Sequence, residues 1–287
     1  ALAFTSDGFS ITNATQEDGD LNFGSRPYPT WCWKTGTAFT NDASATGVGS
    51  IDSAGSVNTD AGFSIVSWTG NGADATIAHG LSQAPTIYFV KNRADAADWR
   101  VGQVLGGNIM TGGNGYYMEL NDAKASTNPG SAVTWGSTPT APTSSVFTVG
   151  SNNAHNGSSD AMIAYCFHSV KGYSKMGSYT GNGNADGTFI YTGFKPAFIL
   201  AKCSSASGDW VITDVKRNPY NALSKRLFPS LTNAESTTNN WYDALSNGFK
   251  ARLSDGTHNG SGKTYIYMAF ASSPFVTGSS AIPTTAR

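Results

Sequence analysis

The stretch WTGNGADATIAHGLSQAPTIYFVKNRADAADW (residues 68–99) recurs as YTGNGNADGTFIYTGFKPAFILAKCSSASGDW (residues 179–210). The two copies align without a gap at a shift of 111 residues. Each has a Thr-Gly-Asn-Gly turn, a proline before an apolar run, a lysine after that run and a final Asp-Trp pair. Similarity at a fixed long spacing indicates tandem copies of one structural unit.

The repeat extends beyond this stretch on both sides. Further along, His155-Asn156-Gly157-Ser158 matches His258-Asn259-Gly260-Ser261 at a shift of 103, so the first copy has about eight more residues of loop. A partial copy stands at the front, where Gly8 to Trp33 is similar to Ser145 to Phe167 and Trp31-Cys32-Trp33 replaces Tyr165-Cys166-Phe167. Because the sequence begins partway through a repeat, it is expected to be the C-terminal part of a longer polypeptide. Alternatively, the first half-unit completes the sheet of another repeat. We predict a partial repeat and linker (1–61), two repeats of about 105–110 residues (62–171 and 172–276) and a tail (277–287).

Short apolar and aromatic runs predict strands within each repeat. They are Thr86–Val90, Ala197–Leu200, Met162–Phe167 and Tyr265–Phe270. Asn-Gly in the two Gly-Asn-Gly connectors is typical of tight hairpin turns. Strands with turns about every ten residues must bury one face against another layer, which predicts an all-β fold of tandem, jelly-roll-like β-sandwiches.

A few segments depart from this strand pattern. Asn239 to Leu245, followed by Asn247-Gly248, predicts a short helix with Asn239 as its N-cap. The segment Asp122 to Pro142 is rich in Ser, Thr and Pro and predicts a loop, as does the glycine-rich segment Gly106 to Gly115, which no phosphate-binding Lys-Ser/Thr follows.

Composition excludes several classes of function. Charged residues are 13% of the chain and the net charge is −1, so there is no excess positive charge to neutralise nucleic-acid phosphates. Aromatic residues at 12% argue against disorder. No apolar run is long enough to span a bilayer and the first residues lack the pattern of a signal peptide, so we expect no membrane insertion.

Metal and cofactor chemistry is not predicted. The three cysteines, Cys32, Cys166 and Cys203, form no CxxC pair and are expected to be buried thiols, although the sequence does not decide the exposure of Cys203. The histidines have no partner at metal-ligand spacing. The loop from Leu253 to Gly260 lacks the alternating acids of a calcium site, and nucleotide and hydrolase motifs are absent.

The repeated motifs resemble the module of phage tail fibre and tail-associated virion proteins, common in marine and cyanobacterial phages. The resemblance is carried by GFSIVSWTGNG, HGLSQAPTIYFVKNR, GYSKMGSYTGNGNADGTFIYTGFKPAFILAK, LSNGFKARLSDG and TYIYMAF, and it spans Gly8 to Phe275. It implies an extracellular virion location, contact with the bacterial surface and other virion proteins, and a homo-oligomer, expected to be a trimer. It supplies no catalytic residue.

Repeated side chains are the candidates for a binding site. Asp98-Trp99 and Asp209-Trp210 pair an acid with an aromatic ring, the combination that stacks on a sugar and accepts its hydroxyl hydrogen bonds. The competing and favoured interpretation makes each tryptophan a core anchor. His155 and His258 are either a duplicated site or, in the favoured interpretation, turn residues that duplication of the scaffold left behind. The basic cluster of Lys216, Arg217, Tyr220, Lys225 and Arg226 suits contact with an acidic surface polysaccharide, but an ordinary solvated loop is favoured.

Three functions remain open from the sequence. The first is a non-enzymatic tail fibre or receptor-binding protein that contacts bacterial surface glycans. The second is a capsid or tail decoration protein without a receptor. The third is a polysaccharide depolymerase, which needs two carboxylates about 5 to 10 Å apart. No pair is preferred among the candidates Asp95, Asp98, Glu119, Asp122, Asp186, Asp209, Glu235, Asp243 and Asp255.

Overall fold

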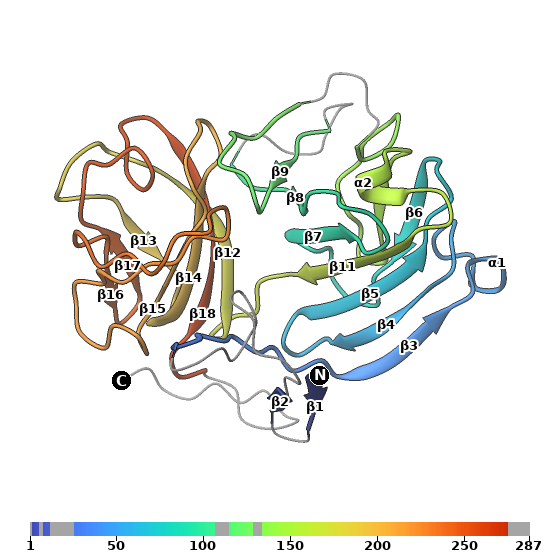
Figure 1. The fold of residues 1–287 in the computed structure, drawn as a ribbon, viewed down its shortest axis with the longest axis horizontal. Helices are drawn as coiled ribbons and strands as arrows, with labels where there is room; N and C mark the ends of the chain where they lie inside the picture. The colour runs from blue at the N-terminus through green and yellow to red at the C-terminus, as the bar shows by residue number, and fades with distance from the viewer. Residues whose placement is uncertain (1, 6–7, 12–25, 107–114, 129–133, 275–287) are drawn as a thin grey trace. The chain divides into compact units, whose positions relative to one another are not determined.

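The computed structural model describes residues 2–5, 8–11, 26–106, 115–128 and 134–274 (Figure 1). Contacts divide the chain into two units, Ala1–Lys34 and Thr35–Arg287. The first unit contains a hairpin of β1 (Leu2–Phe4) and β2 (Phe9–Ile11), followed by residues 26–34 without strands. The second unit contains two β-sheet modules, residues 35–171 and residues 172–274.

The regular elements of the two modules follow the chain in order. The first module contains β3 (Thr37–Asn41), α1 (Ala43–Thr46), β4 (Ser53–Asn58), β5 (Phe63–Thr69), β6 (Ala75–Ala78), β7 (Ile87–Asn92), β8 (Arg100–Gln103), β9 (Met118–Glu119), β10 (Val146–Val149), α2 (Asn153–Asn156) and β11 (Ala161–Phe167). The second contains β12 (Ser174–Thr180), β13 (Phe189–Tyr191), β14 (Pro196–Cys203), β15 (Val211–Asp214), β16 (Tyr242–Leu245), β17 (Gly248–Ala251) and β18 (Thr264–Ala271).

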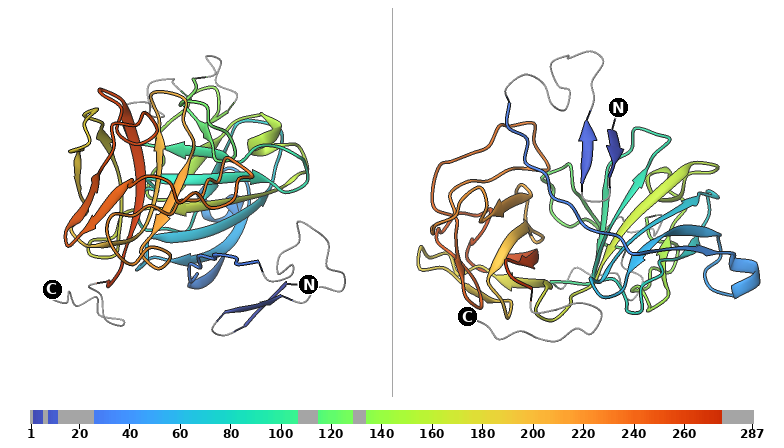
Figure 2. Two further views of the ribbon diagram at one scale, coloured as in Figure 1. Left: turned by 60° about the vertical axis from the view of Figure 1, so that its left-hand side comes forward. Right: turned by 90° about the horizontal axis from the view of Figure 1, so that it is seen from below.

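Each module pairs a large sheet with a small one. In the first, the sheet β3-β4-β5-β11-β7-β8-β9 and the pair β10-β6 enclose a core that includes Trp68, Tyr88, Trp135 and Phe147. In the second, the sheet β12-β18-β14-β15 and the sheet β13-β17-β16 enclose Tyr179, Tyr242, Phe249 and Tyr265. All strand pairs are antiparallel, and Figure 2 shows the strands of each module grouped together from two further sides. The predicted all-β, sandwich-like fold is confirmed.

The four strands predicted from apolar runs are all present. They correspond to β7, β14, β11 and β18. Five of the six residues of β7 are buried, because its neighbours β11 and β8 cover both edges and the sheet is covered on both faces. A continuous apolar run rather than an alternating one is the pattern that such a strand requires.

The Gly-Asn-Gly connectors are tight turns, but they do not close hairpins. Gly72 and Gly183 have positive φ, as expected. The strands on either side of each turn, however, lie in different sheets: β5 pairs with β11 and β6 with β10, and β12 and β13 are separated in the same way. The turn therefore carries the chain from one layer of the sandwich to the other.

The repeated His-Asn-Gly-Ser turns explain this difference, because each holds a Gly-Asn-Gly turn in place. The fully buried Asn156 donates from Nδ2 to Asn71 Oδ1 and to Ala73 O, both at 2.7 Å. Its repeat mate Asn259 has three acceptors within 2.8 to 2.9 Å of Nδ2, which share its two N–H bonds: Asn182 Oδ1, Asn184 O and Leu253 O. We call these contacts the asparagine latch of each module.

The predicted short helix is corrected by the structure. Tyr242–Leu245 is strand β16 rather than a helix, and Asn239 has φ 69° instead of the extended backbone of an N-cap. Tyr242 and Ala244 point into the core while Asp243 and Leu245 do not, and pairing with β17 satisfies this alternation. Residues 31–33, which are similar to residues 165–167 of β11, form no strand.

The first 61 residues contribute to both units. Thr35 begins the second unit, and β4 pairs with β5 over its whole length. β3 and β4 therefore extend the large sheet of the first module. The predicted tail, 277–287, lies outside the described residues.

Direct contacts join the two modules. Trp210 donates from Nε1 to Glu119 O (2.7 Å), and both Lys202 Nζ and Gly208 N donate to Ala123 O. Ser126 N donates to Ser204 O at 2.8 Å. The loop that follows β9 thus docks on the second module.

Candidate functional site

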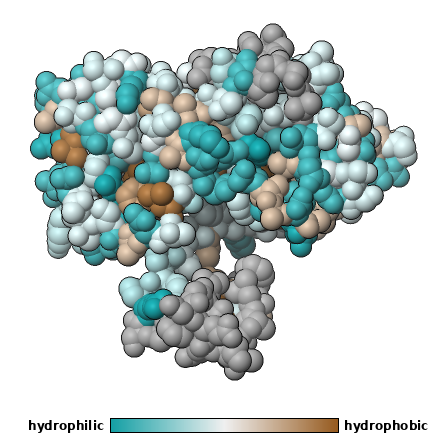
Figure 3. Space-filling view, turned by 45° about the horizontal axis from the view of Figure 1, so that its top comes forward, coloured by the Kyte–Doolittle hydropathy of each residue, from teal (hydrophilic) through white to brown (hydrophobic). Residues whose placement is uncertain are grey.

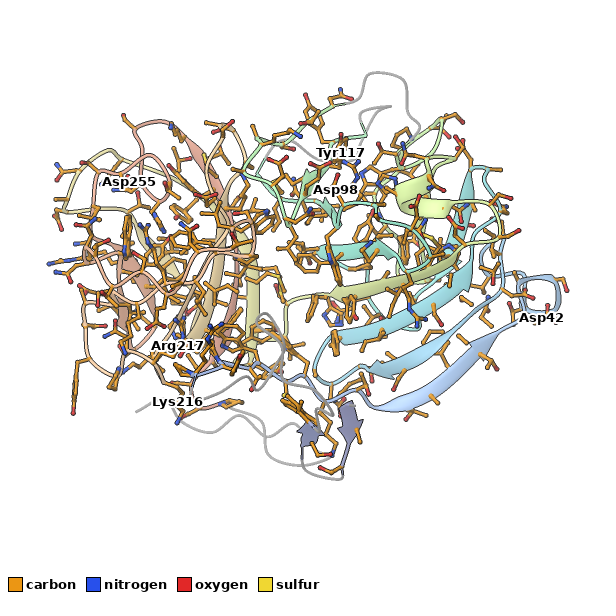
Figure 4. All side chains as sticks on the ribbon, viewed as in Figure 1. Asp42, Asp98, Tyr117, Lys216, Arg217 and Asp255 are labelled. Carbon is orange, nitrogen blue, oxygen red and sulfur yellow. The ribbon has the colours of Figure 1, made fainter. Side chains whose placement is uncertain are left out.

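The first predicted pair, Asp98-Trp99, lies immediately before β8. Asn121 links the two residues: its Oδ1 accepts from Trp99 N at 3.0 Å and its Nδ2 donates to Asp98 Oδ1 at 2.8 Å. Leu120 N donates to Trp99 O, so the segment after β9 holds the pair from the other side. Figure 4 shows Asp98 beside Tyr117 on the first module.

Among the described residues of 35–274, Trp99 differs from the other tryptophans because its indole N–H makes no hydrogen bond. Trp68, Trp135, Trp210 and Trp241 each donate from Nε1 to a protein oxygen at 2.7 to 3.1 Å. Within the described residues, Trp99 Nε1 has no such acceptor, and the side chain is only partly buried, with its ring 5.9 Å from that of Tyr165. Trp99 therefore offers an aromatic surface and a donor to a ligand. Its ring packs on Tyr165, whereas the carboxylate of Asp98, its neighbour in the chain, contacts Asn121 and Arg100.

The second predicted pair, Asp209-Trp210, has a structural role. Trp210 is 1% exposed and its indole N–H is bonded to the first module. Asp209 accepts from Ser230 Oγ at 3.1 Å. Trp210 is thus a core residue, as the favoured interpretation has it, whereas its repeat mate Trp99 is only partly buried.

Several charged groups meet near the first pair. Arg100 forms an ion pair with Glu119, lies 4.0 Å from Asp98, and stacks over the ring of Tyr117 at 4.4 Å. Lys124 Nζ lies 2.8 Å from Asp122 Oδ2 and 3.7 Å from Glu119 Oε2. The three candidate carboxylates Asp98, Glu119 and Asp122 thus come together, with cations between them.

Two of these carboxylates have opposite pKa shifts. Burial raises the pKa of Glu119, against the opposing effect of Arg100. Hydrogen bonding to Lys124 lowers the pKa of Asp122. Glycoside hydrolysis uses two neighbouring carboxylates, but Glu119 and Asp122 with Arg100 and Lys124 also form a structural ion network.

The two repeated histidines are buried in aromatic surroundings. The ring of His155 lies 4.8 Å from that of Trp135, and the ring of His258 lies 4.4 Å from that of Trp241. No ring nitrogen of either residue is within hydrogen-bond distance of a partner in the described residues, although His258 Nδ1 lies 3.7 Å from Asp255 Oδ1, which opposes the effect of burial. Burial lowers the pKa of both, so both are neutral core residues at pH 7 and do not serve as accessible bases.

The basic cluster of the second module is largely neutralised. Arg217 pairs with Asp214 and Glu235, and Lys225 Nζ lies 3.9 Å from Glu235. Arg226 stacks over the ring of Trp241 at 3.5 Å. Lys216 and Tyr220 are exposed, and Figure 4 shows Lys216 and Arg217 on the second module.

No metal or membrane site is found in the part of the chain that the structure describes. These residues contain no group of three or more His, Cys, Asp or Glu able to hold a metal ion. None of their helices is long and apolar enough to cross a bilayer. Cys166 and Cys203 are buried as expected, and burial raises the pKa of Cys166 to about 12, whereas Cys32 is exposed, contrary to expectation.

Sequence reasoning named Tyr220 within the basic cluster but missed the two other strongly exposed aromatic side chains, both in β13. Phe189, Tyr191 and Tyr220 are 45%, 65% and 81% exposed. A signal was available for the β13 pair, because the aligned positions of the first copy contain no aromatic residue.

The class of protein defined by these observations is a tandem β-sandwich with a partly exposed tryptophan, Trp99, on the first module. Over residues 1–274 the chain matches the family described as "Domain of unknown function (DUF7483)", and it belongs to that family. Comparison with curated proteins and with solved structures yields no match.

Proposed function

We propose that the protein is a non-enzymatic phage virion component, from a tail fibre or receptor-binding protein, that contacts bacterial surface glycans. The observation that carries the glycan-binding part is Trp99, which is partly exposed and whose indole N–H has no partner within the described residues; the partly exposed Asp98 precedes it in the chain. Stacking on an aromatic ring with hydrogen bonding to a carboxylate is the chemistry that recognises a sugar.

The rest of the molecule is compatible with such a role. The resemblance to phage tail modules supplies the virion location and the expected trimer. Single weak sites gain affinity when several copies bind one surface, because each bound copy raises the effective concentration of the next. The surface in Figure 3 is mostly hydrophilic, with small hydrophobic patches over the second module, which suits contact with hydroxyl-rich polymers.

The test is co-sedimentation with a panel of bacterial envelope polysaccharides, using the full chain and a Trp99→Ala variant. We expect Trp99→Ala to weaken binding by about tenfold or more, as loss of a central aromatic contact does. Tyr220→Ala, which removes another exposed aromatic ring on the second module, is the matched control and should bind as the wild type does. Binding by none of the polysaccharides would favour the alternative of a capsid or tail decoration protein.

The depolymerase remains the second alternative, and the gathering of Asp98, Glu119 and Asp122 around Arg100 and Lys124 is the observation that favours it. New reducing ends in the supernatants would support cleavage. Their loss in Glu119→Gln and Asp122→Asn, with binding retained, would assign the two carboxylates. Supernatants without reducing ends would leave these side chains as a structural ion network.

A further inference from the structure

The outer face of the small sheet in the second module presents two aromatic side chains to solvent. In β13, Ile190 points into the core while Phe189 and Tyr191 point outward, because side chains alternate along a strand. Two residues apart on one strand, the rings stand about 7 Å from each other along the sheet. Large aromatic side chains are usually buried, so two exposed ones on a single short strand suggest a binding surface.

Glycines lie beneath both rings. Phe189 pairs with Lys250 and Tyr191 with Gly248 in β17. Cε2 of Phe189 lies 3.1 Å from where a Cβ on Gly248 would stand, and the hydroxyl oxygen and Cζ of Tyr191 lie 3.5 and 3.7 Å from the corresponding point at Gly193. The rings thus lie along backbone that has no side chain, which leaves their other surfaces open.

The first module shows that the fold does not require these rings. Ile77 pairs with the buried Phe147 in β6 and β10, as Ile190 pairs with the buried Phe249 in β13 and β17. By this register the positions of Phe189 and Tyr191 correspond to Thr76 and Ala78, two residues away from the Ala78 and Gly80 of the gapless sequence alignment; neither assignment places an aromatic residue there. The scaffold is therefore built with small residues at these places, and the aromatic pair is specific to the second copy.

Charged groups surround the rings and are paired with one another. Lys250 forms an ion pair with Asp186, and Arg252 Nε lies 3.5 Å from Asp243 Oδ2. Asp186 and Arg252 are well exposed, so their remaining hydrogen-bonding capacity faces water. The site combines apolar ring surfaces with balanced polar neighbours and no net charge.

We propose that Phe189 and Tyr191 form a second glycan-binding platform, selective for uncharged sugar units. The inference rests on the proposed glycan-binding function and adds a site to it that is separate from Trp99. Ring faces take the apolar side of a pyranose, and the neighbouring carboxylates and cations bond its hydroxyl groups. A protein partner fits less well, because two rings supply little of the roughly 800 Å² per partner that a stable interface buries, and because charged residues are depleted from interface cores.

The test uses the double substitution Phe189→Thr and Tyr191→Ala, which installs the residues that the first module already holds at these positions. The probes are soluble neutral glucan, mannan and galactan and purified bacterial O-polysaccharide, each in affinity electrophoresis. We expect the double variant to lose about tenfold or more in affinity for a polysaccharide that the wild type binds, with an unchanged melting temperature. Tyr191→Phe should keep most of the affinity, because it keeps the ring.

The outcomes separate this inference from the proposed function. Unchanged affinity of the double variant, with binding lost in Trp99→Ala, would overturn the platform and leave the proposed function standing. Wild-type binding to none of the probes or envelope polysaccharides would overturn both. A change in oligomeric state of the double variant in sedimentation velocity, without a change in glycan affinity, would identify β13 as a protein contact and also overturn the platform.

Discussion

Asn156 and Asn259 show how a single residue type is used twice for one structural purpose. Each amide is fully buried and bonds the turn that links the two layers of its own sandwich. Buried amides are stabilising only when their partners are present, and loss of such a side chain leaves several groups without partners. The repeated His-Asn-Gly-Ser motif is therefore explained by folding rather than by ligand binding.

We predict that Asn259→Ala destabilises the protein by about 2 to 4 kcal/mol, because it removes a buried side chain with at least three hydrogen bonds. The measurement is urea unfolding followed by tryptophan fluorescence. Asn247→Ala, at an exposed turn, is the control and should change the unfolding free energy by less than about 0.5 kcal/mol. Equal effects of the two substitutions would contradict the latch.

Lys202 is a fully buried lysine whose ammonium donates to Cys203 O and Ala123 O. Burial lowers its pKa to about 8. In the unfolded chain the pKa returns to its usual value near 10.5, so between these values the unfolded state binds more protons and stability rises with pH.

We therefore predict that the unfolding free energy increases by about 2 kcal/mol between pH 7.5 and 9.5. Lys202→Met should flatten this rise, whereas substitution of the exposed Lys175 by Met should preserve it. Denaturant titrations at several pH values give the comparison. A wild-type curve that is flat or falls over this range would show that burial does not shift the lysine.

At the scale of elements, the turns between layers depend on close backbone contact. A Cβ on Gly181 would lie 2.3 Å from Gly260 O, and one on Gly70 would lie 2.1 Å from Gly157 O. These contacts leave no room for a side chain, and the atoms that would have to move are backbone atoms of the latch turn.

We predict that Gly181→Ala destabilises the second module by about 3 kcal/mol or more, because the latch turn must separate from the Gly-Asn-Gly turn. Gly208→Ala is the control: its nearest neighbour would be 3.7 Å away, its φ is not positive, and its N–H bond to Ala123 O is retained. Thermal unfolding monitored by circular dichroism distinguishes them. A similar melting temperature for the two variants would contradict the close packing of the turns.

At the scale of the whole molecule, three buried neutral histidines govern behaviour in acid. His79 accepts from Leu81 N at Nδ1 and donates from Nε2 to Thr143 O, and burial lowers its pKa to about 4. Protonation of His79 at Nδ1 would place a second N–H against the N–H of Leu81, which is itself a donor. His155 and His258 have lowered pKa values for the same main reason, burial. Each contributes stability that is present above pH 6.5 and is lost as the pH falls.

We predict that the folded protein loses several kcal/mol of stability between pH 7 and pH 4.5, with His79 alone contributing about 3 kcal/mol at the limit. The urea midpoint should fall steadily across this range. His155→Phe and His258→Phe, which keep an aromatic ring, should each reduce the dependence on pH. An unfolding free energy independent of pH in this window would contradict the neutral assignment of the three residues.

The sequence by itself determined the all-β class, the repeat and the four core strands, because these depend on local signals that recur: apolar runs of strand length, turn residues and matched spacing. Tertiary structure decided the rest. Tyr242–Leu245 has a composition that suits a short helix, yet pairing with β17 makes it a strand. Each Gly-Asn-Gly turn has hairpin residues, yet the latch carries the chain to the opposite sheet.

The site residues show the same division. Asp98-Trp99 and Asp209-Trp210 are equivalent in sequence, and nothing local distinguishes them. In the fold, Trp210 is buried and donates to Glu119 O, whereas the N–H of Trp99 has no protein partner in the described residues. Likewise, alternation predicts which side of β13 faces out, but exposure of Phe189 and Tyr191 depends on what lies over that face. Burial is a property of distant segments, so a residue's own neighbours in the chain do not encode it.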